Sequence, residues 1–391
     1  MSNVPATVAI PAMPRMTPPP LPARGQPSSA APPADWAAIE AALLLSRPVT
    51  GVSLRTLDLR GRTLAGAVFE GCDLRAMDLD GCDLTRVTLI DCALAGADLR
   101  GAILSETTCV RCDLSDARMP QGVPSRLVLV DCRLARSHWA GAHLDRSAAS
   151  QCDFSGADLR ALRLERTVLW KPALAGADLR GAIFDQAALC DTDLRQTRME
   201  GVQGDHAVLM KNDLRGRSLA GATLHRCQLQ GSDLRGADLT GIDLSESGCI
   251  QVDFSGATLA GLRAPRALFL SARFDGVVLR GSDLHGAMFH GAVIEKTRFD
   301  GCAMRESSWE KSRMRDVAFT GCDLRWARFD HARIDDGAIA RCRMQHSRMH
   351  GTRLNNVRLR GVSRRGQIGT DDALLAIEAP TLDLEDLPCA P

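Results

Sequence analysis

A five-residue period runs through this chain from Val52 to Gly361 without an insertion or a deletion. Stepping by five from Leu54 to Leu359 gives 62 positions, called repeat centres here, of which 35 are Leu and ten are Phe. Those ten are all the Phe residues of the protein. The centres without a large apolar or sulfur-containing side chain are Pro124, Ala149, Gly204 and Ala264. Period five fits neither an amphipathic helix nor an alternating strand, so each unit is predicted to be a short extended piece followed by a turn.

Each unit is too small to bury its own apolar residues. The centre and the residue two positions before it are predicted to point inward, and the other three to form the surface and a corner, where Gly is frequent. A unit of this kind must stack on copies of itself. The chain has 391 residues, a length that normally indicates two or more domains, but a fixed period predicts one stacked array instead.

The sequence also has a longer period of 20 residues, which equals four of the five-residue units. The weak centres Cys109, Ala149 and Cys249 fall in one class of a 20-residue cycle, and Pro124 and Gly204 fall in the next class with Ala264. The other two classes contain only large apolar centres. Four pentapeptides therefore make one coil, and the 62 centres make between 15 and 16 coils.

The clearest copies of the unit are Ala97-Asp98-Leu99, Ala157-Asp158-Leu159, Ala177-Asp178-Leu179 and Ala237-Asp238-Leu239. They resemble the pentapeptide repeat family, whose motif is A-(D/N)-L-x-x. The resemblance implies an all-β solenoid, a right-handed quadrilateral β-helix of about 15 coils with one pentapeptide on each face. We expect a short capping helix before the array and a short helical, acidic tail after it.

These features divide the chain into four segments. Pro- and Ala-rich composition predicts a disordered leader over 1–34. Asp35 is a candidate N-cap for an amphipathic helix that contains Trp36 and Ile39, so residues 35–51 are predicted to be a capping helix and entry. The array covers 52–361. The tail covers 362–391, with a helical turn or two beginning near Asp371.

Charge and cysteine usage limit the functions to consider. The array carries 43 Lys and Arg against 39 Asp and Glu, so no strong field favours nucleic acid as a partner. Ten of the 14 Cys residues occupy one repeat position, two before a centre, which predicts small buried side chains in a reducing compartment. No signal peptide or membrane span is predicted. The expected location is the cytoplasm, with export by a specialised secretion system left open.

The chemistry-bearing motifs are weak. Cys109 and Cys112 form a lone C-x-x-C, and His346 and His350 form H-x-x-x-H without the helix or the Glu of a zinc protease. A stacked outward column that suggests either a cation site or a screened surface ladder consists of Asp145, Glu165, Asp185 and Asp205. No phosphate loop or nucleophile elbow is present. We therefore predict no enzyme activity, no cofactor and no metal site.

Outward positions on one face are unexpectedly apolar. This face has centres such as Leu89, Leu169 and Phe269, and the equivalent positions on the other faces are mostly Arg, Asp, Ser, Thr and Ala. The apolar residues that follow its centres, called the apolar stripe here, are Ile90, Val110, Val130, Trp170, Met210, Ile250 and Leu270. A stripe of this length exceeds the apolar patch usual on a monomer. It predicts contact with a protein partner or a second copy, with β-propensity or cover by the leader as alternatives.

The C-terminal end is unevenly charged. Eight Arg and no acid lie between Arg341 and Arg365, and six acids and no base lie between Asp371 and Asp386. Either the tail folds back over the basic coils or the arginines meet an anionic partner with which the tail competes. The candidate anion-binding end consists of Arg341, Arg343, Arg348, Arg353 and Arg358.

The predicted function is a non-enzymatic protein-interaction scaffold. The family resemblance implies two narrower roles, a bacterial secretion-system effector or adaptor and a DNA-mimicking protein that binds topoisomerases. A flexible leader ahead of a rod is compatible with the first role. The second requires a strongly acidic surface, which the near-neutral array does not have.

Overall fold

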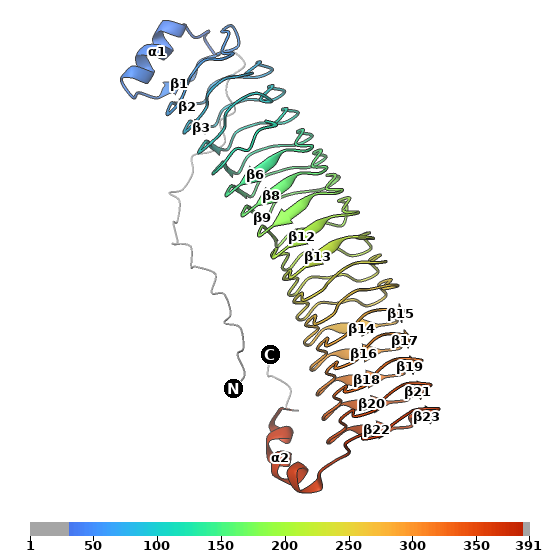
Figure 1. Ribbon diagram of the computed structural model, residues 1–391. Helices are drawn as coiled ribbons and strands as arrows, with labels where there is room; N and C mark the ends of the chain where they lie inside the picture. Colours follow the sequence, from blue (N-terminus) through green and yellow to red (C-terminus); the bar gives the residue numbers. More distant parts are fainter. Residues whose placement is uncertain (1–30, 386–391) are drawn as a thin grey trace.

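The structure is a computed structural model that describes residues 31–385, which form an elongated rod of stacked coils (Figure 1). Parallel strands of two or three residues line the rod, and each strand pairs with the strand 20 residues further along, as in Phe69 with Leu89 and Phe299 with Phe319. Four sheets result, and isolated bridges such as Gly248 with Leu268 continue the pairing where regular strands are absent. The predicted quadrilateral β-helix and its 20-residue period are confirmed.

The four sheets lie on four faces, numbered here in the order in which they are described. Face 1 contains β1 (Val49–Thr50), β2 (Val68–Glu70), β3 (Thr88–Ile90), β4 (Thr108–Val110), β5 (Val128–Val130), β7 (Ala148–Ser150), β9 (Val168–Trp170) and β11 (Ala188–Cys190). Face 2 contains β6 (His143–Asp145), β8 (Arg163–Glu165), β10 (Ile183–Asp185), β12 (Gln203–Asp205) and β13 (Thr223–His225). Face 3 contains β14 (Arg273–Asp275), β16 (Val293–Glu295), β18 (Arg313–Arg315), β20 (Arg333–Asp335) and β22 (Arg353–Asn355). Face 4 contains β15 (Val278–Arg280), β17 (Arg298–Asp300), β19 (Ala318–Thr320), β21 (Ala338–Ala340) and β23 (Arg358–Arg360).

The core is built from the repeat centres, which are buried almost throughout the rod. In the C-terminal half the aromatic centres stack from coil to coil: the ring centroids of Phe269 and Phe289 are 4.9 Å apart, and those of Phe289 and Trp309 are 4.1 Å apart. The indole N–H of Trp309 donates to the Ser307 hydroxyl at 2.8 Å, which satisfies the one polar atom of that side chain. Identical register in every coil therefore gives a continuous apolar core.

The residue two positions before each centre also points inward and completes the core beside the centre. Cys92 and Cys112 donate their S–H groups to the carbonyl oxygens of Phe69 and Leu89 in the preceding coil, both at 3.4 Å. Thr107 makes the equivalent bond to Leu84 at 2.7 Å. Burial raises the pKa of the Cys82 thiol to about 12. These cysteines are free and buried, and they act as small donors in the core.

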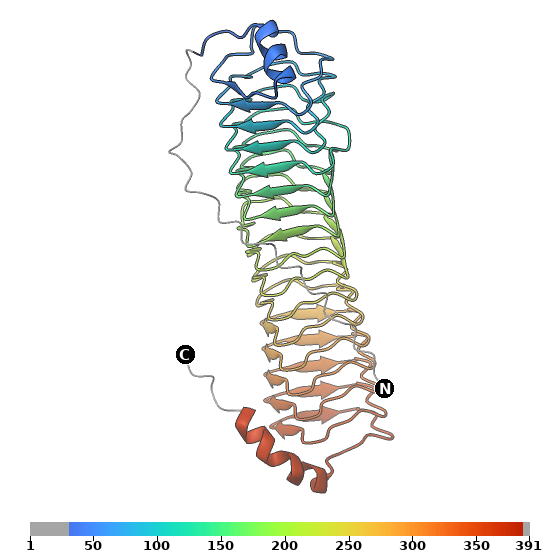
Figure 2. The same cartoon turned by 90° about the vertical axis from the view of Figure 1, so that its left-hand side faces the viewer.

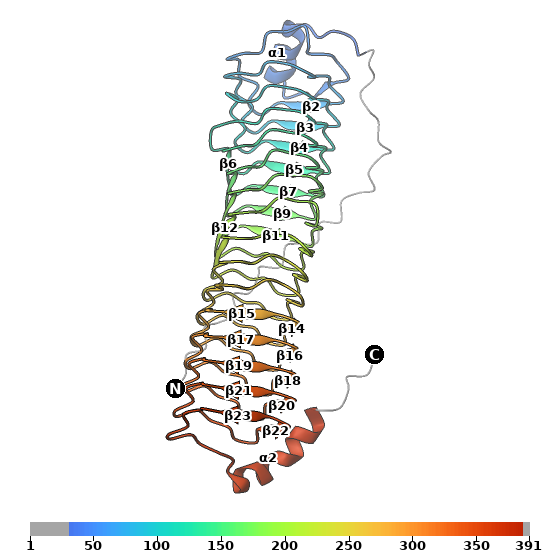
Figure 3. The same ribbon diagram turned by 90° about the vertical axis from the view of Figure 1, so that its right-hand side faces the viewer.

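A helix lies at each end of the rod, and the two helices cover the end coils to different extents. Helix α1 (Trp36–Leu44) begins after the N-cap Asp35, buries Ile39 and lies over the first coil (Figure 2). Helix α2 (Asp372–Glu385) lies beside the last coils (Figure 3). Because α2 leaves the last coil open, the centres Leu354 and Leu359 are 39% and 41% exposed.

The observed segment limits differ slightly from the predicted ones. Pro33 already pairs with Ser53, and the last bridge joins Arg348 to Ile368, so coil pairing includes residues beyond 52–361 at both ends. Helix α2 has 14 residues, longer than the turn or two predicted, because its first turns pack against the rod. Most of the predicted leader lies outside the described residues. Neither helix of the described chain is long and apolar enough to span a bilayer.

Candidate interaction surfaces

The apolar stripe lies on face 1, where the structure places its members in one column. Ile90 is in register with Val110, and Val110 with Val130. Trp170 lies between Ser150 and Cys190. The stripe is interrupted by Ser150 and by Gln230.

Exposure along the stripe is uneven. Trp170 is 47% exposed and its other six members are partly buried. The Lys171 ammonium lies 5.7 Å from the centroid of the Trp170 ring, within the range of a cation–π contact. The residues before the centres of face 1 form a parallel column in which Leu268 pairs with Met288 and Met288 with Ser308, and Met288 is 46% exposed. Trp170 is therefore the most accessible apolar group of the stripe.

Repeated Asp–Arg pairs occupy other faces. In the Asp98–Arg100 pair the carboxylate accepts from the Arg100 backbone N–H at 3.2 Å and from the guanidinium at 2.9 and 2.7 Å. The same arrangement, an acid followed two residues later by Arg, occurs nine times among the described residues. This pairing was not among the features predicted from the sequence, although the spacing of Asp and Arg across each centre is its signal. The pairs neutralise surface charge locally.

These pairs predict an acid-sensitive rod. The Arg195 side chain and backbone N–H lower the pKa of Asp193 from 3.8 to about 2, and Arg180 lowers the pKa of Asp178. A lowered pKa in the folded state adds stability above the unfolded value and loses it as pH falls toward the folded value. We expect an unchanged melting temperature from pH 7 to 5 and a progressive fall between about pH 4 and 2. Melts of wild type and Asp193→Asn, followed by circular dichroism, test this. A main loss of stability between pH 7 and 5 would contradict the prediction.

The acidic column predicted from sequence is on face 2. Asp145 accepts from Arg166 at 2.8 Å, and Arg166 also reaches Glu165. Asp185 pairs with Arg163 at 3.2 Å. Asp205 lies 3.1 Å from His206 and 3.3 Å from His225. Every carboxylate of this column has a basic partner, which favours the screened ladder over the cation site.

The candidate anion-binding end is dispersed by the fold. Arg343, Arg348, Arg353 and Arg358 immediately precede four successive centres and so lie on four different faces, and Arg341 lies at a corner. Arg348 is 3.4 Å from Asp330. Neighbours in sequence are therefore separated around the rod, and these five side chains do not form one patch.

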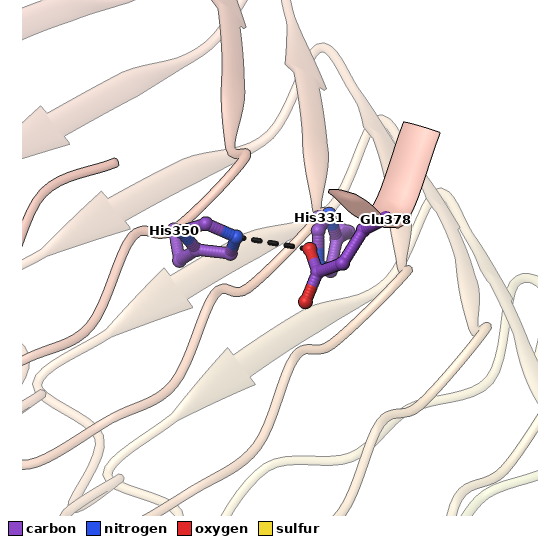
Figure 4. Close-up of side chains that lie close together, drawn as sticks. All are labelled: His331, His350 and Glu378. Carbon is purple, nitrogen blue, oxygen red and sulfur yellow. Dashed lines mark hydrogen bonds and ion pairs between the residues drawn. The ribbon is translucent and has the colours of Figure 1, made fainter. Parts of the chain in front are cut away.

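Helix α2 is held against the rod by a cluster of two histidines and one glutamate (Figure 4). The Glu378 carboxylate lies 3.1 Å from His331 Nε2 and 3.0 Å from His350 Nε2. The His350 side chain is only 5% exposed. The backbone N–H of Asp371 donates to His350 Nδ1 at 3.1 Å. The acidic tail therefore folds back onto histidines, whereas the sequence pointed to the arginines.

The same three residues are the described group that comes nearest to a set of metal ligands, with their ligand atoms within 4.8 Å of one another. A metal bound at His350 Nε2 would need a lone pair on that nitrogen. The bond from Asp371 to Nδ1 places the proton of a neutral His350 on Nε2, directed at Glu378. The arrangement therefore fits a docking contact better than a metal site.

The remaining predicted motifs are not brought together into a site. His346 stacks on Trp326, with ring centroids 4.3 Å apart, while His350 turns toward Glu378, so the H-x-x-x-H pair is split. Cys109 and Cys112 are both buried in the core. Among the described residues, neither pair has both of its members in a group of three or more possible metal ligands.

The geometry defines a class of protein: a solid four-sided solenoid whose accessible features are all on its outer faces. Family models for pentapeptide repeats match eight stretches between residues 53 and 305, and a model for the pentapeptide repeat region matches 292–367. The chain therefore belongs to the pentapeptide repeat family. No match was found among curated proteins.

Solved structures with the same repeat are similar to this chain. QnrB1, a plasmid-mediated fluoroquinolone resistance protein, is 18% identical over 67% of this chain and 98% of its own, with a TM-score of 0.32. HetL from Nostoc, involved in heterocyst differentiation regulation, is 25% identical over 60% and 90%, with a TM-score of 0.20. A protein from the Arabidopsis thaliana thylakoid lumen is 33% identical over 24% and 65%, with a TM-score of 0.23. These similarities concern the repeat.

Proposed function

We propose that the protein is a non-enzymatic interaction scaffold that binds a protein partner, or a second copy of itself, through the apolar stripe on face 1. The observation that supports this most directly is the exposure of Trp170, 47%, on β9, the strand next to the last one of face 1, whose outward column is otherwise largely apolar. A large aromatic ring exposed on a largely apolar surface is typical of residues that carry binding energy.

The other faces support the same choice. Their outward columns carry charged residues that pair with each other, such as Asp98 with Arg100 and Asp213 with Arg215. These side chains already have partners on the rod itself. A DNA-mimicking role would require a strongly acidic surface, and the Arg partners remove that character. The role in a secretion system stays an alternative, and the identity of a captured partner would distinguish it from a general scaffold.

The test is a double substitution, Trp170→Asp with Met210→Asp. Both side chains point outward, so we expect the fold to remain and the contact to fail because two charges would enter an apolar interface. Light scattering reports the size of the purified protein, and an affinity pull-down from native lysate reports a partner. We expect a smaller species or loss of the captured protein, with an unchanged circular dichroism spectrum.

Trp326→Asp provides a matched control. Trp326 is 48% exposed, as accessible as Trp170, but it lies outside the apolar stripe and stacks on His346. This variant should keep the size and the partner of wild type. Unchanged size and unchanged capture in the double variant as well would refute the role of the stripe.

A further inference from the structure

A groove lies between face 3 and helix α2, at the C-terminal end of the rod. Its volume is about 770 Å³, which is within the range of small-molecule sites. Thr370 and Leu375 contribute the wall on the tail side, and the strands of face 3 contribute the other wall. Helix α2 lies beside the C-terminal coils that carry these strands (Figures 1 and 3).

The described lining of the groove has more basic than acidic side chains, although Lys311 and Arg313 already have interaction partners. Its lining includes Lys311 and the four arginines Arg313, Arg315, Arg333 and Arg353, against two carboxylates, Glu295 and Asp335. Only Arg353 belongs to the arginine cluster predicted from sequence. The basic side chains of the groove therefore come from successive coils, and they are separated by up to about 40 residues in the sequence.

Three of these arginines are stacked. Arg313 is in register with Arg333, and Arg333 with Arg353, so the three residues follow one another along one column at the ~4.8 Å spacing of paired strands. Like charges directly opposite one another on a sheet are destabilising. Arg333 is compensated by Asp335 at 2.7 Å. Among the described residues, the side chains of Arg315 and Arg353 have no hydrogen-bond or ion-pair partner.

This arrangement contrasts with the rest of the rod, where an Arg after a centre pairs repeatedly with the Asp before it. In the groove the Arg residues stand before the centre, and the next residue of the same unit that faces outward is Arg315, Asp335 or Asn355. The Arg315 and Arg353 side chains are thus left without a carboxylate partner among the described residues, on the wall of the groove. Guanidinium groups bind phosphate bidentately, and a column of them suits a chain of phosphates.

We propose that this groove binds a ligand that carries a polyphosphate chain. Arg333 and Arg353 would hold successive phosphate groups, and Arg315 would contact the chain from the neighbouring outward column. The site is separate from the apolar stripe on face 1, so it does not depend on the proposed scaffold function. A free polyphosphate and the polyphosphate of a nucleotide share this chemistry.

Isothermal titration with sodium tripolyphosphate at low ionic strength tests the proposal on the full-length protein. We expect one site per chain, with binding that weakens as NaCl is added. The double variant Arg333→Gln with Arg353→Gln should bind at least about tenfold more weakly, since two charge-assisted contacts are removed. Parallel titrations with ATP and AMP separate the sources: tighter binding of ATP than of tripolyphosphate identifies a nucleotide, and equal binding identifies the phosphate chain alone.

The matched control is Arg263→Gln with Arg280→Gln, which removes the same charge at exposed positions where the nearest carboxylates are 3.9 and 3.8 Å away. This control should bind tripolyphosphate within about twofold of wild type. Equal weakening in both double variants, or no binding by wild type, would overturn the proposal. Arg353→Gln alone, in the open last coil, gives a milder variant if the double variant is unstable.

Discussion

Phe289→Ala should destabilise the C-terminal half of the rod by about 3–5 kcal/mol, the usual cost of replacing a buried Phe by Ala. The ring is 1% exposed and lies between Phe269 and Trp309, with the Trp309 ring nearly parallel at 2°. Truncation leaves a cavity between two coils that are fixed by strand pairing above and below. The surrounding backbone therefore has little freedom to collapse into the space.

Hydrogen exchange is the suitable measurement for Phe289→Ala, because stability in a repeat array is a sum of local terms and unfolding of a long array is not reliably two-state. Amides in the coils between residues 269 and 309 should lose protection, and those near Leu99 should keep it. Met288→Ala is the matched control, since Met288 is adjacent and 46% exposed. Equal loss of protection in both variants would show that the aromatic stack is not the source of stability.

Cys112→Asp is expected to cost a similar amount, on the order of several kcal/mol, because it places an unpaired carboxylate in the interior. Cys112 is 1% exposed, and its S–H donates to the Leu89 carbonyl oxygen. An ionised Asp cannot donate, so the Leu89 oxygen would face a negative charge. The loss should be smaller at pH 4 than at pH 8, because protonation of a buried carboxyl removes the charge.

Cys112→Thr is the corresponding control. Thr107 and Thr167 already occupy the equivalent position, and their hydroxyl groups donate to Leu84 and Leu144. We expect a melting temperature close to that of wild type for Cys112→Thr and a large decrease for Cys112→Asp. A large decrease for Thr as well would mean that the thiols of this column have a role that packing and hydrogen bonding do not explain.

The sequence was sufficient to predict the repeat architecture. A centre every five residues, a small residue two before it, and weak centres that recur every 20 residues specify which side chains face inward and how many faces the coil has. The reason is that each coil repeats the same local conformation and the same neighbours, so a rule read from one unit, such as Ala97-Asp98-Leu99, holds for the next. The burial of Cys112 and its equivalents follows from the same rule.

Only the tertiary structure decided which surface residues meet. Stacking separates Arg343 from Arg348 onto different faces and brings Arg313, Arg333 and Arg353 into one column, because distance around the rod is set by the coil and not by nearness in sequence. The docking of Glu378 on His331 and His350 joins a segment outside the repeat to two coils. No period predicts such a contact, since it depends on where a non-repeating helix finds complementary groups on the finished rod.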